Sequence, residues 1–367
     1  MRYLTSLVLL SAITCPGLAP AAEPTVAPVR ITGWVSTQSD FQHSFPSFYN
    51  HAARLTEISP FWFHPTQDGS VTAYEADRNT GKRLDQIEGL FMSVCRANGI
   101  KVLPCLGEAG GEFEGAARKI MHDPKLRAVH IRNLVALAKS RGYDGLDIDY
   151  EGLKVEDRDA YGAFMTELST AMHAEKLLLT AAVFAKTDEP GDWDGPQAQD
   201  WSLLAKVLDR VRIMIYDFHE DSSKPGSIAP MDWFKDVITL ALKRFKPEQI
   251  QAGIPTYGYD WQLDDGAEDL PQRDGPIIAA RFGATLYYEP DQACSHFTYE
   301  TLGSPHDAWY EDARALPAKI KILQDAGIWG IAVWQFSEEG EDFWQAVGPI
   351  RPSEPSAPRP PSPPNHL

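Results

Sequence analysis

Eight short apolar segments recur along this chain of 367 residues, and an amphipathic stretch separates each from the next. Short apolar runs bounded by turn residues are typical of β-strands. They cover residues 29–35, 55–63, 100–106, 145–150, 177–184, 211–216, 250–254 and 328–333. Strands that alternate with helices build a parallel sheet. Eight such units predict an α/β fold, a (β/α)8 TIM barrel, which typically takes about 250 residues as one domain.

The alternation is interrupted once, between about residues 262 and 307. This stretch holds Gly, Pro and acidic clusters, followed by two strand-like aromatic segments. We interpret it as a small α+β insertion after strand seven that builds one wall of a cleft. Tyr287, Tyr288 and Phe297 lie in its strands, and we expect only alternate residues to face a ligand, because successive side chains on a strand point to opposite faces.

Both ends of the chain differ from the barrel in composition. Residues 1–22 resemble a secretory signal, with Arg2, an apolar run over 4–13 and a small-residue cleavage site at 19–21. Cys15 as a lipidation site is the weaker alternative. Residues 351–367 are rich in Pro and Ser, which predicts a disordered tail. We therefore expect a secreted or periplasmic protein whose catalytic barrel spans 23–350.

Charge and cysteine content exclude several kinds of partner. The formal net charge is −17, whereas nucleic-acid binding needs a basic surface, and nothing here attracts anionic membranes. After the signal, the chain keeps Cys95, Cys105 and Cys294. A short bridge between Cys95 and Cys105 is possible, and buried free thiols are at least as plausible. The cysteine spacing indicates no metal site. We also expect no cofactor, and a monomer.

The chemistry of the chain is concentrated in residues 144–151, Asp-Gly-Leu-Asp-Ile-Asp-Tyr-Glu. In an extended strand, Asp147, Asp149 and Glu151 share one face, at intervals of about 6–7 Å. Like charges at this spacing cannot all ionise easily, so we expect at least one raised pKa. A protonated carboxyl beside an ionised one is the arrangement that acid-catalysed glycoside cleavage needs. A row of solvent-facing or salt-bridged acids is the alternative.

The spacing Asp-x-x-Asp-x-Asp-x-Glu is similar to the signature of glycoside hydrolase family 18, which contains chitinases, chitobiases and endo-N-acetylglucosaminidases. Met-Ile-Tyr-Asp at 214–217 resembles the Met-x-Tyr-Asp strand end of this family. The segments 253–261, 309–312 and 330–334 resemble the branch that includes spore-cortex peptidoglycan glucosaminidases. The matches run from about residue 29 to about residue 347. One departure is that relatives in this branch often carry wall-binding repeats, and none is apparent here.

The resemblance implies a role for each carboxyl. Glu151 would be the general acid and base, and the 2-acetamido oxygen of the substrate would replace a carboxylate nucleophile. Asp149 would orient the acetamido nitrogen and stabilise its charge. Asp147, deeper on the same face, would share a proton with Asp149. Asp144 has the opposite parity, and we interpret it as structural.

Other strand ends supply candidates for binding sugar. Tyr216 would hydrogen-bond the acetamido carbonyl, with a buried core tyrosine as the alternative. Met214 would line the pocket beneath it, and Asp217 would contact the sugar or Tyr216. Trp334 would stack under a pyranose ring, and a core tryptophan is its alternative. Tyr257 is a weaker candidate for the cleft wall.

These observations predict a retaining β-N-acetylglucosaminide hydrolase without metal or cofactor, acting by substrate assistance. Its substrate would be β-1,4-linked GlcNAc glycans, either peptidoglycan strands or chitin oligosaccharides. Two alternatives stay open. One is a non-catalytic lectin on the same barrel, although family 18 lectins usually lose the acid that is present here as Glu151. The other is an endo-β-N-acetylglucosaminidase that acts on N-glycans.

Overall fold

The computed structural model describes residues 30–36, 41–74, 83–108, 115–263, 266–328 and 330–348. The expected signal segment, Cys15 and the expected tail lie outside these residues. Among the described helices, none is long and apolar enough to span a bilayer. The three cysteines in the described part are buried and free, so Cys95 and Cys105 form no disulfide.

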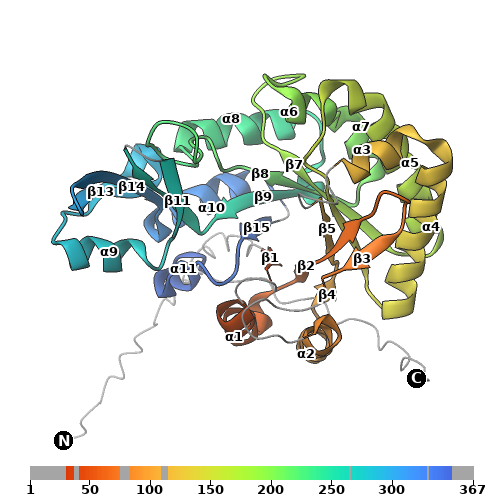
Figure 1. The fold of residues 1–367 in the computed structure, drawn as a ribbon, viewed down its shortest axis with the longest axis horizontal. Coiled ribbons are helices and arrows are strands. Elements are labelled where there is room, and N and C mark those ends of the chain that lie inside the picture. The colour runs from red at the N-terminus through yellow and green to blue at the C-terminus, as the bar shows by residue number, and fades with distance from the viewer. Residues whose placement is uncertain are drawn as a thin grey trace, which may run out of the picture.

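Eight parallel strands form a closed barrel, as the alternation of segments predicted (Figure 1). In barrel order they are β1 (Arg30–Val35), β2 (Glu57–Pro65), β5 (Cys105–Gly107), β6 (Gly145–Asp149), β7 (Leu178–Phe184), β8 (Arg210–Met214), β9 (Ile250–Pro255) and β15 (Gly330–Trp334). The barrel closes because β1 pairs with both β2 and β15. Two short strands pair with β2: β3 (Val71–Ala73) runs antiparallel to it and β4 (Lys101–Val102) runs parallel to it.

The strand expected over 100–106 is in fact two strands, β4 and β5. Pro104 lies between them, and a proline has no N–H to donate to the ladder. The strands expected over 145–150 and 211–216 end earlier, at Asp149 and Met214. Glu151 and Tyr216 therefore follow their strands and lie in the loops at the barrel mouth.

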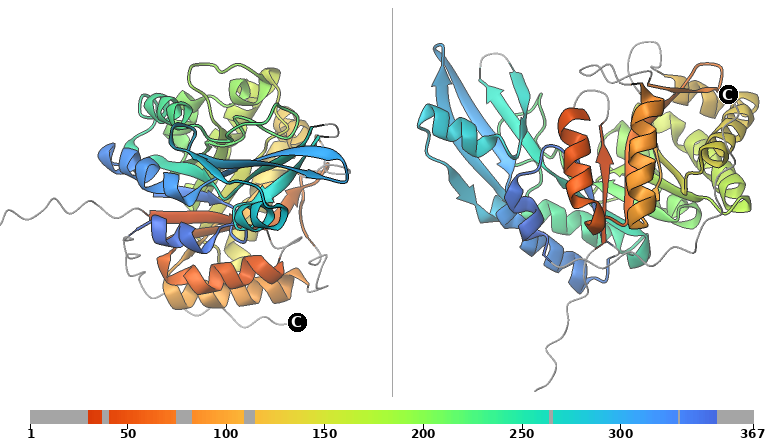
Figure 2. Two further views of the ribbon diagram at one scale, coloured as in Figure 1. Left: turned by 90° about the vertical axis from the view of Figure 1, so that its left-hand side faces the viewer. Right: turned by 90° about the horizontal axis from the view of Figure 1, so that it is seen from below.

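Helices cover the outside of the barrel. They are α1 (Phe41–His51), α2 (Leu84–Asn98), α3 (Ala116–His122), α4 (Pro124–Arg141), α5 (Arg158–Ala174), α6 (Asp194–Ala198), α7 (Trp201–Val207), α8 (Met231–Ala241), α10 (Leu316–Asp325) and α11 (Glu341–Ala346). Figure 2 shows α1 and α2 side by side against the strands. Each helix or helix pair joins one barrel strand to the next, except α11, which follows the last strand.

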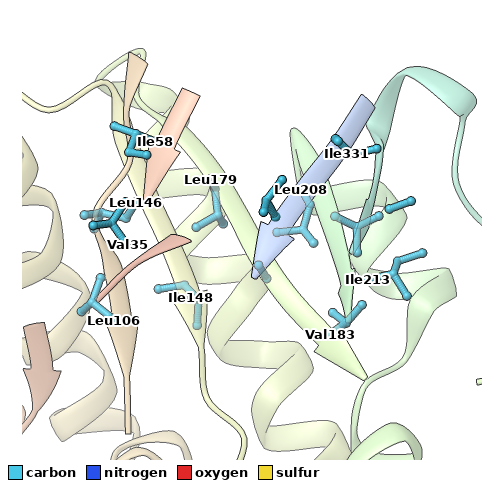
Figure 3. Packing of buried hydrophobic residues seen from close by; sticks show 14 of the residues in the cluster. Val35, Ile58, Leu106, Leu146, Ile148, Leu179, Val183, Leu208, Ile213 and Ile331 are labelled. Atoms are coloured by element: carbon cyan, nitrogen blue, oxygen red, sulfur yellow. The ribbon is translucent and has the colours of Figure 1, made fainter. Parts of the chain in front are cut away.

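The main core lies between the strands and this helical layer. Alternate residues of the strands, such as Leu146 and Ile148 of β6, point outward into it (Figure 3). They are fully buried and share the cluster with Phe164 and Leu168 of α5. The other strand residues face the barrel interior, so Asp147 and Asp149 share one face of the acidic strand, as expected.

The barrel interior has two layers. Toward the mouth, an apolar layer includes Trp34, Cys105 and Met214. Deeper, the interior is polar, and its buried side chains are Thr32, Glu57, Ser59, Asp147, Thr180, Arg212 and Gln251. A charged layer inside a barrel requires that every charge be paired.

An antiparallel sheet follows the seventh barrel strand and forms a lobe beside the barrel (Figures 1 and 2). Its elements are β10 (Tyr257–Gln262), β11 (Gly266–Pro271), α9 (Gly275–Phe282), β12 (Tyr287–Glu289), β13 (Cys294–Thr301) and β14 (Ser304–Glu311). This insertion is wider than the expected 262–307, because β10 begins only two residues after β9 ends. The expected seventh-strand segment 253–261 is therefore divided between the barrel and the insertion.

Candidate active site

The carboxyl ends of the barrel strands surround a pocket of about 710 Å³. The insertion contributes to it from one side through Tyr259. The lining residues are Trp34, Phe61, Asp149, Glu151, Phe184, Ala185, Trp193, Met214, Tyr216, Asp217, Glu220, Asp221, Trp233, Tyr259 and Trp334. The lining drawn from the described residues combines aromatic rings with five carboxyl groups and contains no Lys, Arg or His.

Glu151 lies two residues beyond the end of β6, and its side chain is open to the pocket. The surrounding walls exclude water from its carboxyl, and the nearby charge of Asp217 adds to this effect. Together they raise the pKa of Glu151 to about 7, while a hydrogen bond with Asp149 opposes the rise. The spacing of the acidic strand predicted at least one raised pKa, but the charge that raises this one belongs to Asp217, outside the strand. A carboxyl with a pKa of about 7 can donate or accept a proton near neutrality.

Asp149 ends β6 and lies just below Glu151, with 6% of its surface exposed. Burial is the largest cause of its raised pKa, followed by the charges of Glu151 and Asp147, while Arg212 opposes the rise. Its Oδ2 accepts a long contact from the Cys105 thiol at 3.9 Å. Its Oδ1 is buried and receives no N–H or hydroxyl donor from the described residues. Among these residues, the hydrogen bond that Asp149 shares with the Glu151 carboxyl is the one contact that can bring a proton to this side of the pocket.

Asp147 lies fully buried below Asp149 and has three donors of its own. Trp34 Nε1 and Arg212 Nη1 each donate to Asp147 Oδ2 at 2.8 Å. Thr180 Oγ1 donates to Asp147 Oδ1 at 2.5 Å. The expected sharing of a proton between Asp147 and Asp149 stays a prediction. The three donors hold the Asp147 side chain in one orientation.

Tyr216, Met214 and Trp334 all line the pocket. Burial and the surrounding carboxylates raise the pKa of Tyr216 far above its ordinary value, so its hydroxyl keeps its proton. Among the described residues this hydroxyl has no hydrogen-bond partner, which leaves it available to a ligand. Trp334 is held edge-on by Trp34 and Phe61, at ring-centroid distances of 6.0 and 5.2 Å. Its indole is therefore fixed in the pocket.

Asp217 follows Tyr216 with a left-handed backbone conformation, φ 60°, which Asp tolerates better than most residues. Its Oδ1 accepts hydrogen bonds from the hydroxyls of Tyr257 at 2.5 Å and Tyr259 at 3.1 Å. Desolvation raises the pKa of Asp217, and these two hydrogen bonds oppose the rise. Tyr257 itself is buried and does not line the pocket, whereas Tyr259 does.

The opposite face of the acidic strand serves the fold. The hydroxyl of Tyr150 lies 2.7 Å from Nε2 of His130 in α4. Asp144 accepts a hydrogen bond from the backbone N–H of Val102 at 2.9 Å, away from the pocket. This contact agrees with the structural role expected for Asp144.

Several pocket residues were not among the sequence candidates. They are Trp34, Phe61, Phe184, Trp193, Trp233, Tyr259, Glu220 and Asp221. Trp34, Phe61 and Phe184 lie near the carboxyl ends of β1, β2 and β7, a position that was itself a usable signal. Trp193 and Trp233 come from a loop and from α8, and no sequence pattern places them at the mouth.

The insertion extends the pocket with a line of rings that we call the aromatic row: Tyr259, Trp309, His296 and Tyr287. These residues are direct cross-strand neighbours on β10, β14, β13 and β12. His296 stacks on Trp309 at 4.2 Å and on Tyr287 at 5.4 Å. Phe297, by contrast, is buried on the other face beneath α9, and Tyr288 packs against Arg314. Only alternate residues of these strands therefore lie on the face that leads to the pocket.

An acid with a raised pKa next to a second buried carboxyl, set among indole rings at a barrel mouth, is typical of barrel glycoside hydrolases. The sequence profile described as glycosyl hydrolases family 18 matches residues 30–339. The chain therefore belongs to glycoside hydrolase family 18, as its motifs indicated, and is a glycoside hydrolase.

Relatives and solved structures agree with this assignment. The chain is 29% identical over 242 residues to the uncharacterized glycosylase YvbX of Bacillus subtilis, which covers 64% of this chain and 70% of that protein. It is 28% identical over 226 residues to a cortical fragment-lytic enzyme of Bacillus subtilis, covering 59% of this chain and 52% of that enzyme. The match thus covers about half the length of this cortical fragment-lytic enzyme.

The structural match extends further along the chain. A chitinase from Chromobacterium violaceum superposes with a TM-score of 0.78 at 24% identity, over 87% of this chain and 98% of that one. The spore cortex-lytic enzyme SleL of Bacillus cereus gives a TM-score of 0.79 at 20% identity, over 89% of this chain and 75% of that one. At these identities the likeness shows the shared fold.

Proposed function

We propose that this protein hydrolyses β-1,4-linked N-acetylglucosamine glycans with retention of configuration, using the 2-acetamido group of the substrate as nucleophile. The observation that carries the proposal is the buried Asp149 Oδ1, to which the described residues offer no N–H or hydroxyl donor and beside which the Glu151 carboxyl lies. An acetamido N–H is a donor that would satisfy this oxygen. A plain hexose has no N–H at that position.

In this mechanism Glu151 protonates the leaving glycosidic oxygen while the acetamido carbonyl oxygen attacks the anomeric carbon. The C–O bond to the leaving sugar breaks, and an oxazolinium-type intermediate forms. Asp149 holds the acetamido N–H and stabilises the positive charge that develops. The hydroxyl of Tyr216 donates to the acetamido carbonyl. Glu151, now ionised, then removes a proton from water, which opens the intermediate from the face that the leaving group vacated.

The pocket wall supports a pyranose ring in this position. Trp334 presents a fixed indole, and an aromatic face offers a large contact area at low entropic cost. Trp193, half exposed and packed on Phe184 at 4.5 Å, provides a second ring at the mouth. The aromatic row continues outward from Tyr259, which supports binding of a chain of sugars.

The charge of the pocket favours a neutral glycan at the cut. Five carboxyl groups line the pocket, and the described part of the chain contributes no cation to the lining. Chitin-type chains carry no charge, whereas the lactyl and peptide carboxylates of peptidoglycan do. Among the two substrates predicted, this balance favours chitin oligosaccharides or glycan strands that have lost their peptides. Because the chain is similar to cortical fragment-lytic enzymes, peptidoglycan remains a candidate substrate.

We also propose that the protein acts outside the cytoplasm, on the basis of the signal-like residues 1–22.

Product analysis by mass spectrometry would test the proposed function. The protein is incubated in parallel with chitooligosaccharides, peptidoglycan and a high-mannose glycopeptide, with Glu151→Gln as the inactive control. Shortened chitooligosaccharides, absent from the control, are the expected products. Cleavage of the glycopeptide alone would identify an N-glycan endoglycosidase. Tight binding of the oligosaccharides without any product would identify a lectin.

A further inference from the structure

A long connection with little regular structure follows the fifth barrel strand. Residues 185–200, which we call the β7 loop, join β7 to α7, and the helix that they contain is α6, with five residues. Connections of this length are uncommon in compact domains and often carry function. The β7 loop brings Ala185 and Trp193 to the pocket. The contacts that hold this loop in shape therefore also shape the pocket wall.

A buried ammonium group lies at the centre of the β7 loop. Lys186 is 3% exposed. Its Nζ donates to three backbone carbonyl oxygens, those of Pro190 at 3.3 Å, Pro196 at 3.0 Å and Gln199 at 2.8 Å. A fourth acceptor, Glu189 Oε2, lies 3.1 Å away and supplies the negative charge that a buried cation requires. Because an ammonium has three N–H groups, these four oxygens use its whole donor capacity.

This one side chain connects the whole length of the β7 loop. The three carbonyl groups belong to residues 4, 10 and 13 positions after Lys186. The ammonium also lies over the buried ring of Trp201 in α7, with Nζ 5.1 Å from the ring centroid. At the far end of the loop, Gln199 Oε1 accepts from the backbone N–H of Phe184 in β7 at 2.8 Å. Loss of the ammonium would deprive three carbonyl groups of their common donor, which is costly where water is excluded.

Trp193 takes its position from the β7 loop. Its ring is half exposed at the pocket and packs edge-on against Phe184 at 4.5 Å. A Cβ at Gly195 would overlap the rings of both Trp193 and Phe184, so the close approach of the chain behind the indole requires a glycine. Two of the carbonyl groups that Lys186 binds lie on either side of Trp193 in the sequence. The backbone is thus fixed immediately before and after this ring.

We propose that Lys186 is a positioning residue: by binding the carbonyl groups of the β7 loop, it holds the indole of Trp193 ready to stack on a sugar ring of the substrate. This inference rests on the proposed function, in which Trp193 is a sugar-binding ring. Lys186 acts through Trp193 and does not itself line the pocket. A ring that is already in place needs no ordering when the sugar binds, which improves affinity.

Fluorine-19 NMR of protein labelled with 5-fluorotryptophan tests the position of Trp193 without any substrate. The chain has 10 tryptophans, and loss of one signal in Trp193→Phe identifies the signal of Trp193. In the wild type this signal should be well separated from that of free 5-fluorotryptophan, because the Phe184 ring lies against the indole. In Lys186→Met it should broaden or move toward the free position. A wild-type signal that already lies at the free position would overturn the proposal, even if Lys186→Met fails to fold.

Lys319→Met is the matched control for this measurement. Lys319 is also fully buried, and its Nζ likewise binds a carboxylate and a backbone carbonyl, those of Glu311 at 2.6 Å and Ala229 at 3.1 Å. Both lysine variants should lower the melting temperature. The Trp193 signal should move in Lys186→Met alone. An equal displacement in both variants would show that Lys186 merely stabilises the fold, and would contradict the proposal.

Steady-state kinetics on a long chitooligosaccharide provide the second test. Lys186→Met should raise KM by roughly 2- to 10-fold, the range for loss of one aromatic contact, with kcat nearly unchanged. Trp193→Ala should do the same, and the double variant should be no worse than Trp193→Ala, because Lys186 acts through that ring. Gly195→Ala displaces the ring while leaving the contacts of Lys186 in place, so it should raise KM as well.

Three kinetic outcomes would contradict the proposal. They are additive effects of Lys186→Met and Trp193→Ala, an unchanged KM in Trp193→Ala, and a fall of kcat in Lys186→Met at constant KM. Failure of the proposed function would appear differently. In that case the wild type itself would not hydrolyse N-acetylglucosamine chains, while the NMR comparison would still report whether Lys186 fixes Trp193.

Discussion

Three carboxyl groups follow one another at alternate positions of a single strand, yet each meets a different environment. Asp147 accepts hydrogen bonds from three side chains, Asp149 is buried with one oxygen that receives no N–H or hydroxyl donor from the described residues, and Glu151 is open to the pocket. Carboxyl groups at a regular spacing are thus held in place, left open to a donor, or exposed to the pocket. Environment, more than residue type, separates the acid from its neighbours.

Replacing Glu151 by Gln should abolish turnover while preserving the fold. The amide keeps the shape of the side chain but cannot transfer a proton, so kcat should fall by about 10²–10⁴-fold or more. Steady-state hydrolysis of a chitooligosaccharide measures this loss, and sugar affinity by calorimetry should stay close to that of the wild type. Turnover near the wild-type rate would show that another group is the acid.

The same substitution should stabilise the protein at alkaline pH. The pKa of Glu151 is about 7 when folded and near the ordinary glutamate value of 4.5 when unfolded, so the folded state holds this proton more tightly. The contribution of Glu151 to stability is therefore fully present below pH 4.5 and is lost as the pH rises through about 7. Melting curves should show Glu151→Gln above wild type at pH values over 7, and the gap should close in acid. A gap that widens in acid would contradict the sign of this shift.

At the residue scale, the sequence predicted Asp149 and Glu151 but not the side chains that bind the neighbouring Asp147. The alternation of Asp147, Asp149 and Glu151 follows from strand geometry, so their shared face and a raised pKa could be derived. Arg212 and Trp34 lie on other strands, and they meet Asp147 only because the barrel closes. One sequence carries no information on which inward residues meet across a barrel, and this is why the donors to Asp147 could not be predicted.

At the scale of elements, the break between β9 and β10 decides which tyrosine reaches the pocket. Tyr257 and Tyr259 belong to one apparent strand in the sequence, but the chain leaves the barrel at Thr256 and enters a second sheet. Tyr257 then lies behind Asp217, while Tyr259 faces the pocket. The eight strands were predictable from their apolar runs. Where each strand ends was not, because that depends on pairing between distant segments.

The aromatic row should matter for long substrates only. Tyr287 is 54% exposed at the far end of the row, so Tyr287→Ala should remove a remote sugar contact without disturbing the core. Loss of one aromatic contact typically costs about 0.5–1.5 kcal/mol, or roughly 2- to 10-fold in kcat/KM. Rates on a long chitin chain and on a trisaccharide measure the effect, and only the former should decrease.

Tyr49, which is 60% exposed on α1, provides the matched control. Tyr49→Ala removes a similar exposed ring outside the row and should leave both rates unchanged. If Tyr287→Ala and Tyr49→Ala behave alike on the long chain, the row does not bind sugar.

At the scale of the whole molecule, charge should sort the substrates. The net charge of −17 and the acidic pocket both repel anionic chains, and salt screens such repulsion. The value of kcat/KM for a peptide-bearing peptidoglycan fragment should rise with ionic strength, whereas that for a neutral chitooligosaccharide should stay nearly constant. Parallel rate measurements over a salt series test this. A preference for the anionic fragment at low salt would show that cations outside the pocket lining dominate binding.

Substrate assistance is the central claim, and time-resolved proton NMR of the products tests it most directly. A chitooligosaccharide and its fully N-deacetylated counterpart are compared under identical conditions. The account predicts that the new reducing end appears first as the β-anomer, and that the deacetylated chain is not cleaved because it lacks the attacking acetamido oxygen. Appearance of the α-anomer first, or efficient cleavage of the deacetylated chain, would contradict it.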